Sequence, residues 1–180
     1  MSDDTELNQP AETDSDDLDS TVETQYGAVM SLSGDQIVVH PTIDEWLDVA
    51  TAARADGYDQ LTDLTAVDYL TYGGRRTVPS GVGAERYEVV AHLLSLGRRR
   101  RLRMRVQVSE SAPTVPTLFD VWPGAEAMER EVFDMFGITF SDHPDHSRIL
   151  MPEDWDGHPL RKDYAIGDIP VQFKAASNVR

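Results

Sequence analysis

The segment 86–108, with the sequence RYEVVAHLLSLGRRRRLRMRVQV, is the feature that most narrows the folds open to this chain. Apolar residues recur at every second position in both halves of the segment, and successive side chains of a β-strand point to opposite faces of a sheet. The segment therefore predicts the two arms of a β-hairpin with one dry face. The residues expected on that face are Tyr87, Val89, Ala91, Leu93, Leu102, Met104, Val106 and Val108.

The opposite face of the second arm carries three arginines and a glutamine, namely Arg101, Arg103, Arg105 and Gln107. A solvated outer face of a sheet is the simpler interpretation, and a surface that binds a partner protein is the alternative. Nucleic acid is a minor alternative, because no aromatic residue interleaves the arginines to stack on bases. The formal net charge of −16 also argues against general nucleic-acid binding.

Further elements are expected on both sides of the hairpin. Thr42 with Glu45 three positions later is typical of a helix N-terminus, and Gly137 is typical of a helix C-terminus. Periodicity predicts a strand at 37–39, a helix over 42–57, a strand over 58–69 and a helix over 122–137. The expected fold class is α+β, a mixed sheet of about four strands with helices packed on one face and a long irregular C-terminal arm.

Charge and composition divide the chain into three parts. Residues 1–25 contain nine acidic residues and no basic residue, a composition that predicts a disordered acidic tail. Residues 26–140 are expected to form the α+β domain, and residues 141–180 an extended arm for partner docking. No window of eighteen apolar residues occurs, so no membrane-spanning helix is expected. The lack of cysteine excludes disulfides, cysteine-ligated iron–sulfur clusters and a cysteine nucleophile.

The predicted arm, residues 141–180, contains four prolines and shows no apolar periodicity. Forty residues without regular structure are unusual inside a compact domain. Its apolar residues indicate that it lies against another surface, and they are Ile149, Leu150, Met151, Trp155, Leu160, Tyr164 and Ile166.

Glu129 falls on the rim of the apolar face when residues 122–137 are placed on a helical wheel. Burying a carboxylate lowers the stability of the fold by several kcal/mol unless the carboxylate is paired and hydrogen-bonded. Arg148 or Arg161 of the arm are the expected partners, and a Glu129 side chain that reaches solvent is the alternative. The same helix offers pairs of opposite charge from Arg130 to Glu126 and to Asp134.

A histidine-rich stretch suggests a metal site as one interpretation. His143 and His146 are separated by two residues and lie among aspartates, which are groups that bind divalent metals. However, Pro144 between them disfavours a helical convergence of the two rings, and His158 lies in a predicted turn. Histidines that bind backbone groups or carboxylates are the simpler interpretation. Glu129 and Glu131 point to different sides of the helix, so joint acid–base catalysis is not expected.

Several motifs in a fixed order resemble one family. EREVFDMFGITF is followed by HP, RIL, PEDW and GHPLRKDY, and is preceded by LTAVDYL, YEVVAHLLSL and VPTLFDVWPGA. Together these motifs resemble the subunit designated C of the proton-pumping NADH-quinone oxidoreductase, respiratory complex I, from about Gly27 to Tyr164. The chain departs from the family pattern at Ala127, where a Trp is usual, and at 145–148, where an apolar residue and two basic residues are usual.

The resemblance implies a cofactor-free structural subunit of the peripheral arm, on the cytoplasmic side of the cell membrane. Such a subunit would support electron transfer from NADH to quinone coupled to proton translocation. Its expected partners are the quinone-site subunit, designated D, and the cluster-bearing subunits B and I. The iron–sulfur clusters, FMN, NADH and quinone would be bound by partner subunits, and no catalytic, cofactor-binding or metal residue is expected on this chain.

The candidate structural or interface residues lie in the second helix and the arm, and they are Glu129, Arg130, Glu131, Asp134, His143, Arg148, His158, Arg161, Lys162 and Asp163. Two other functions are kept open: a freestanding metal-dependent enzyme that uses His143 and His146, and an adaptor unrelated to respiration. The electron donor is also left open, because relatives of such subunits serve complexes that oxidise ferredoxin or reduced deazaflavin.

Overall fold

The computed structural model describes residues 22–72, 74 and 76–165. Its elements, in chain order, are β1 (Thr24–Gln25), β2 (Ala28–Ser33), β3 (Gln36–His40), α1 (Trp46–Ala55), β4 (Gln60–Asp68), β5 (Tyr87–Ser95), β6 (Arg100–Val108), β7 (Thr114–Pro116), α2 (Ala125–Phe136) and β8 (Thr139–Ser141).

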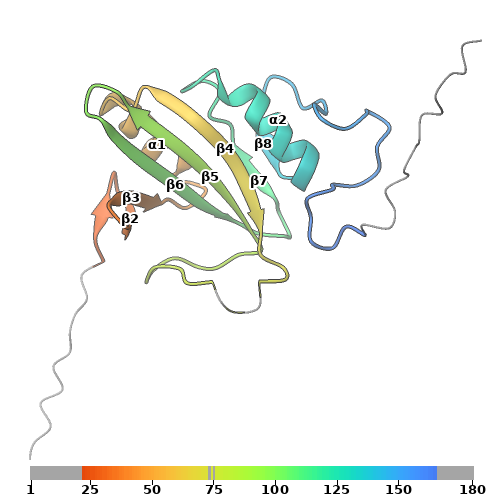
Figure 1. Cartoon of the computed structure of the whole chain (residues 1–180), viewed down its shortest axis with the longest axis horizontal. Helices are drawn as coiled ribbons and strands as arrows, with labels where there is room; N and C mark the ends of the chain where they lie inside the picture. Colours follow the sequence, from red (N-terminus) through yellow and green to blue (C-terminus); the bar gives the residue numbers. More distant parts are fainter. Residues whose placement is uncertain (1–21, 73, 75, 166–180) are drawn as a thin grey trace, which may run out of the picture.

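The main sheet has six strands in the order β1-β2-β3-β6-β5-β4 (Figure 1). β3 pairs with β6 in parallel, and the other neighbours are antiparallel. β7 and β8 form a separate parallel pair. The predicted α+β class with a mixed sheet is confirmed, but the predicted number of about four strands is too low. The additional strands of the main sheet, β1 and β2, are short and only partly buried, so they carry little apolar periodicity.

The predicted hairpin is formed by β5 and β6, with Ala91 opposite Met104. All eight residues predicted on its dry face are at most 1% exposed. On the opposite face, Glu88 is buried and accepts hydrogen bonds from Arg105 at 2.7 Å and from Arg76 at 2.7 Å. This outer face therefore pairs part of its charge within the chain, and Arg76 comes from the segment that joins β4 to β5.

Both helices contribute to one hydrophobic core with the dry face of the sheet. α1 is preceded by the predicted pair of reciprocal contacts, since Thr42 N donates to Glu45 and Glu45 N donates to Thr42. Trp46 is fully buried, and its indole nitrogen donates to Pro116 O at 3.1 Å. Burying one large apolar side chain contributes roughly 1.5–3 kcal/mol, so such residues hold the helices on the sheet.

The C-terminal arm follows β8 and contains no helix or strand from Asp142 to Ala165. Figure 1 shows that it passes beside α2 and then returns toward the end of β4. The predicted arm residues 166–180 and most of the predicted acidic tail, residues 1–21, lie outside the described residues. Thr24 and Gln25, which fall inside the predicted tail, form β1, so the fold extends beyond the boundary predicted at residue 26. Within the described part of the chain, neither helix has the length and apolar character needed to cross a bilayer.

Candidate docking site at the end of helix α2

The carbonyl groups at the C-terminus of α2 are capped by the arm. The last four carbonyls of an α-helix have no partner within the helix. The amide of Gly137 donates to Phe133 O, as is usual for a glycine that ends a helix with positive φ. The arm supplies donors to the next three carbonyls: His158 Nδ1 to Asp134 O, Leu160 N to Met135 O, and Arg161 Nε to Phe136 O.

Asp134 holds the start of this capping segment. Its carboxylate is fully buried and accepts backbone hydrogen bonds from Ile149 at 3.1 Å and from Leu150 and Met151 at 2.8 Å each. It also forms an ion pair with Arg148. Burial alone would raise the pKa of Asp134, but the hydrogen bonds from Met151 N and Arg148 outweigh burial and lower the pKa below its ordinary value.

Arg148 joins two turns of the arm to the helix. Besides its ion pair with Asp134, its guanidinium donates to the carbonyls of Trp155 and Gly157 at 3.0 Å each. A guanidinium can satisfy several acceptors at once because its donors have a fixed planar arrangement. Its positive charge is also stabilised by the negative end of the dipole of α2.

Gly137 is required where the arm crosses the end of α2. Its φ is +69°, a conformation that glycine adopts without strain. A Cβ at this position would lie 2.5 Å from His158 Nε2 and 2.6 Å from Arg161 Nη2. Since a carbonyl only accepts, His158 must carry its proton on Nδ1 to bind Asp134 O. Burial, together with the neighbouring arginines, lowers the pKa of His158 and favours this neutral form.

A second attachment point lies at the end of β4. Asp68 is buried and accepts a hydrogen bond from Lys162 N at 2.9 Å. Arg86 pairs with Asp68 at 2.9 Å and with Asp163 at 2.8 Å, so it links the sheet to the arm. Burial alone would raise the pKa of Asp68, but the hydrogen bonds from Arg86 and from the backbone of Lys162 lower it.

Arg130 attaches the beginning of the arm to α2. Its guanidinium donates to Ser147 O at 3.1 Å and to Ser147 Oγ at 2.7 Å. The predicted pair with Glu126 is formed at 3.1 Å. No pair with Asp134 is formed within the described residues, because the guanidinium of Arg130 is turned toward Ser147. Glu131 is exposed and has no hydrogen bond or ion pair within the same residues.

The predicted burial of Glu129 is confirmed, but its predicted partner is wrong. Glu129 is fully buried and accepts hydrogen bonds from Thr117 Oγ1 and from Leu118 N. Arg148 binds Asp134 and Arg161 binds the end of the helix instead. Glu129 and Asp134 are five positions apart, about 140° around the helix, so they face different neighbours. Burial raises the pKa of Glu129, and the two hydrogen bonds only partly oppose this.

The histidine pair does not form a metal site in the described part of the chain. The rings of His143 and His146 lie 5.1 Å apart, but their nitrogens are directed at backbone groups. His143 Nε2 lies 3.1 Å from Glu126 O, His143 Nδ1 accepts from Asp145 N, and His146 Nε2 accepts from Phe140 N. No group of three or more His, Asp or Glu residues within the described ranges could hold a metal ion. The geometry therefore gives the metal alternative no support.

Comparison with known proteins identifies the family. A family model described as "Respiratory-chain NADH dehydrogenase, 30 Kd subunit" matches residues 39–169, which is most of the chain. The chain belongs to this family. The match includes both helices, the β4–β6 meander and the described arm, so the residues that attach the arm to α2 belong to the family region.

Individual relatives agree with the family assignment. A relative from Roseiflexus castenholzii, the NADH-quinone oxidoreductase subunit designated C, is 49% identical over 138 residues, covering 75% of this chain and 73% of the relative. The NADH-quinone oxidoreductase subunit 5 of Thermus thermophilus is 45% identical over 126 residues, covering 67% of this chain and 58% of the relative. The predicted resemblance to this subunit of complex I is therefore confirmed.

Two solved structures share the fold. A trypsin-resistant fragment of Nqo5 superposes with a TM-score of 0.59 at 35% identity, covering 66% of this chain and 89% of the fragment. A chain of the membrane-bound sulfane sulfur reductase, an archaeal respiratory membrane complex, has a TM-score of 0.64 and covers 77% of this chain and 78% of that chain. At 21% identity, this second likeness indicates the fold alone.

Sequence reasoning missed Asp68 and Arg86, which hold the far end of the arm. Asp68 lies in β4 on the same side as the buried Leu64 and Ala66. An acidic residue in phase with core residues of a strand is a signal that could have identified it, as a similar signal identified Glu129 in α2. Arg86 precedes β5 and carries no comparable signal.

Proposed function

We propose that the chain is a cofactor-free structural subunit of the peripheral arm of an NADH-quinone oxidoreductase complex. It packs against the quinone-site subunit, designated D, and the cluster-bearing subunits B and I, on the cytoplasmic side of the membrane. In this position it supports electron transfer from NADH to quinone coupled to proton translocation, while the partner subunits bind the redox groups. Membership in the 30 Kd subunit family supports the assignment to the complex.

The way the arm is attached is the observation that best supports a docking role. Several of its backbone groups, with the side chains of Arg148 and Arg161, face the domain and bind Asp134, the end of α2 and Asp68. Three aliphatic side chains of the same arm are exposed, with Ile149 at 41%, Leu150 at 54% and Leu160 at 47%. These inward contacts preorganise the arm, and its three exposed aliphatic side chains offer apolar contact area to a partner, beside exposed charged residues such as Glu153 and Asp154.

Preorganisation explains why so many polar contacts are used on an irregular segment. Association costs conformational entropy whenever a binding segment must first become ordered. The contacts with Asp134, Arg148 and Arg161 meet this cost within the chain, before a partner binds. Obligate interfaces commonly bury about 2,000–5,000 Å² in total, and exposed aliphatic residues on an arm are one means of supplying such area.

Co-purification tests the docking role. We expect a tagged chain to recover cluster-bearing subunits from solubilised membranes, and the double variant Leu150→Asp, Leu160→Asp to lose most of them, because charged residues are depleted from interface cores. Leu96→Asp is the matched control, since Leu96 is 63% exposed in the turn between β5 and β6, away from the arm (Figure 1). Equal recovery of the subunits by all three proteins would refute docking through the arm.

The cofactor-free role is tested separately on the purified chain. We expect elemental analysis to find no stoichiometric metal and the absorption spectrum to show no flavin or iron–sulfur bands. A stoichiometric metal that is lost when His143 and His146 are replaced by Ala would instead favour the metal-dependent enzyme.

A further inference from the structure

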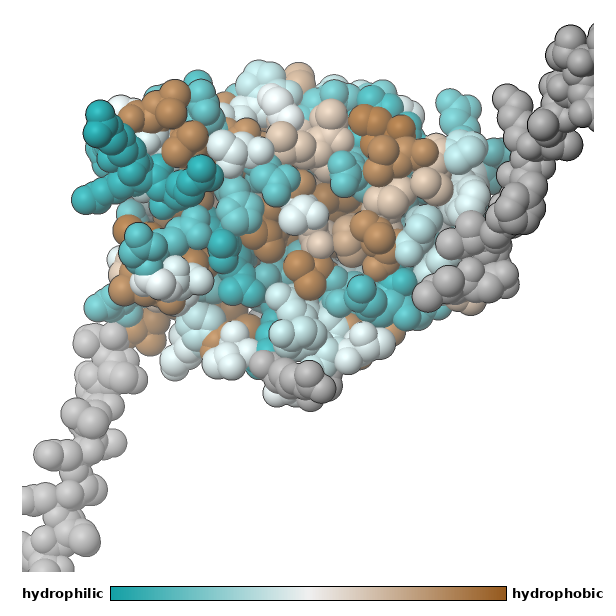
Figure 2. All heavy atoms as spheres, in the orientation of Figure 1, coloured by the Kyte–Doolittle hydropathy of each residue, from teal (hydrophilic) through white to brown (hydrophobic). Residues whose placement is uncertain are grey.

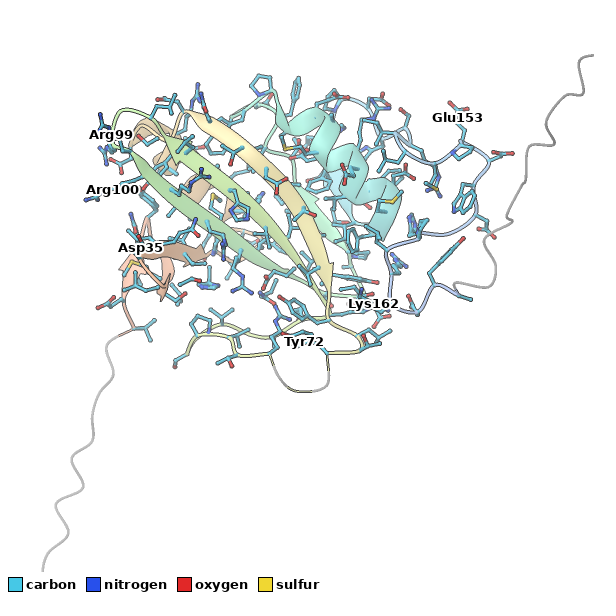
Figure 3. All side chains as sticks on the ribbon, in the orientation of Figure 1. Asp35, Tyr72, Arg99, Arg100, Glu153 and Lys162 are labelled. Carbon is cyan, nitrogen blue, oxygen red and sulfur yellow. The ribbon has the colours of Figure 1, made fainter. Side chains whose placement is uncertain are left out.

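A groove with three exposed arginines lies at the end of the molecule opposite the arm. It is formed where the turn between β2 and β3 meets the start of β6, and it is lined by Leu32, Asp35, Gln36, Ile37, Arg99, Arg100 and Arg101. Figure 3 places Asp35, Arg99 and Arg100 at this one end, and Figure 2 shows strongly hydrophilic side chains gathered there. We call this feature the arginine groove.

The arginines of this groove differ from the other arginines nearby. Arg98 pairs with Asp56, Arg103 donates to Gln36, and Arg105 pairs with the buried Glu88. Among residues 22–72, 74 and 76–165, no carboxylate lies within ion-pair distance of Arg99, Arg100 or Arg101. Asp35 lines the groove but forms no such pair. Three positive charges are thus concentrated on a chain whose formal net charge is −16.

The chain direction in β1 leads toward this groove. β1 runs antiparallel to β2 with Thr24 opposite Val29, and Met30 N donates to Glu23 O at 2.8 Å. Moving from Thr24 toward the N-terminus therefore means moving along β2 toward Leu32, which lines the groove. In the same register Val22 falls opposite Ser31, which is one position from Leu32 of the groove.

The sequence that comes before Val22 is complementary to the groove in charge. Residues 12–19, ETDSDDLD, contain five acidic residues and no basic residue. They also contain Leu18, and the groove has apolar side chains of its own in Leu32 and Ile37. An extended chain advances about 3.3 Å per residue, so the few residues between this segment and Val22 are long enough to reach the arginines.

We propose that the acidic segment 12–19 of this chain binds in the arginine groove. Exposed ion pairs are individually weak, but a segment tethered this closely has an effective concentration in the mM range. Binding would neutralise part of the positive charge of the groove. The groove is at the opposite end of the molecule from the docking arm, and this inference does not depend on the proposed function.

Paramagnetic relaxation in the full chain tests this inference. The chain has no cysteine, so Ser15→Cys provides a single site for a nitroxide label. At about 0.1 M salt, where the Debye length is about 10 Å, we expect the amide signals of residues 32–37 and 99–101 to lose intensity relative to the reduced label. The loss should decrease at about 1 M salt, where the Debye length falls to about 3 Å, to the level that an unbound tether gives.

Two variants that keep the label serve as controls. Neutralising the segment by Asp14→Asn, Asp16→Asn, Asp17→Asn and Asp19→Asn should reduce the intensity loss to that of an unbound tether of this length, and so should Arg99→Gln, Arg100→Gln and Arg101→Gln. The first variant changes no residue of the described domain, so the test stands even if the second variant folds poorly. An equal loss at both salt concentrations, or the same loss in the neutralised segment, would overturn the proposal. Groove signals that respond only to added anionic vesicles or an oligonucleotide would overturn it in favour of that ligand.

Discussion

At the scale of single residues, two buried carboxylates of α2 have opposite electrostatic environments. Asp134 accepts three backbone hydrogen bonds and pairs with Arg148, so its charged form is favoured although it is buried. Glu129 accepts two hydrogen bonds, and no arginine pairs with it among the residues that the structure describes, so burial prevails and raises its pKa. Asp134 attaches the arm to α2, whereas Glu129 attaches the segment Thr117–Leu118 to the same helix.

We predict that Asp134→Asn loosens the arm. The amide lacks the charge that pairs with Arg148, and its NH2 group must face either Arg148 or the backbone amides of residues 149–151, all of which are donors. The expected loss in unfolding free energy is about 2–4 kcal/mol, because the positive charge of Arg148, which is largely buried, is left without its ion-pair partner. Denaturant unfolding measures this loss, and limited proteolysis should show faster cleavage between 142 and 165. Asp154→Asn, at an exposed position in the same arm, is the control and should leave both unchanged.

At the scale of elements, α2 and the arm form one unit. A helix is usually ended by its own flanking residues, but the carbonyls of α2 are capped by residues about 25 positions further along the chain. The arm in turn has only local turns of its own, such as Trp155 N to Pro152 O, and the backbone donors of residues 149–151, Leu160 and Lys162 are satisfied by α2 and by Asp68. Each element completes the hydrogen bonds of the other, and neither should be stable in its observed form alone.

We predict that Gly137→Ala disrupts this junction. Alanine at a φ of +69° is strained, and its Cβ would overlap His158 and Arg161. The expected loss in unfolding free energy is about 1–3 kcal/mol, with faster amide exchange at Leu160. Gly83→Ala is the matched control, because a Cβ at Gly83 would meet no atom within 4 Å. If both variants lost the same stability, the specific role of Gly137 would be disproved.

At the scale of the whole molecule, buried carboxylates make stability depend on pH in two opposing ways. The pKa values of Asp68 and Asp134 are lowered by folding, so their stabilisation is present above the unfolded pKa of about 3.9 and is lost as pH falls through the folded values. The pKa of Glu129 is raised by folding, so its contribution decreases as pH rises above about 4.3. Unfolding free energy should therefore fall steeply in acid.

We predict that Glu129→Gln removes the pH dependence of stability that opposes the one from Asp68 and Asp134. Glutamine is neutral at every pH and can still accept a hydrogen bond from Leu118 N. The difference in unfolding free energy between the variant and the wild type should therefore shift in favour of the variant as pH rises from about 4.3 toward neutrality. Denaturant unfolding over this range measures the difference. A difference independent of pH would mean that Glu129 titrates as it does in the unfolded chain.

The sequence alone determined those features that depend on neighbours along the chain. Alternation identified the dry face of β5 and β6, and the helix-end residues Thr42, Glu45 and Gly137 located the limits of α1 and α2 to within a few residues. The position of Glu129 in the helical period also indicated a buried carboxylate. These features are readable because a strand or helix repeats its environment every few residues.

Only the tertiary structure decided which groups pair across the fold. Asp134 and Arg148 are 14 positions apart, and Lys162 binds Asp68 across 94 positions. Glu129 was an equally charged alternative to Asp134 as the partner of an arginine, and Arg161 was an alternative to Arg148. No local pattern in the sequence distinguishes these alternatives. The choice depends on the direction in which each helix position faces and on the path of the arm, which are set by packing of the whole core. The partners of the buried charges, the order of the strands and the outward side of the arm were therefore decided in three dimensions.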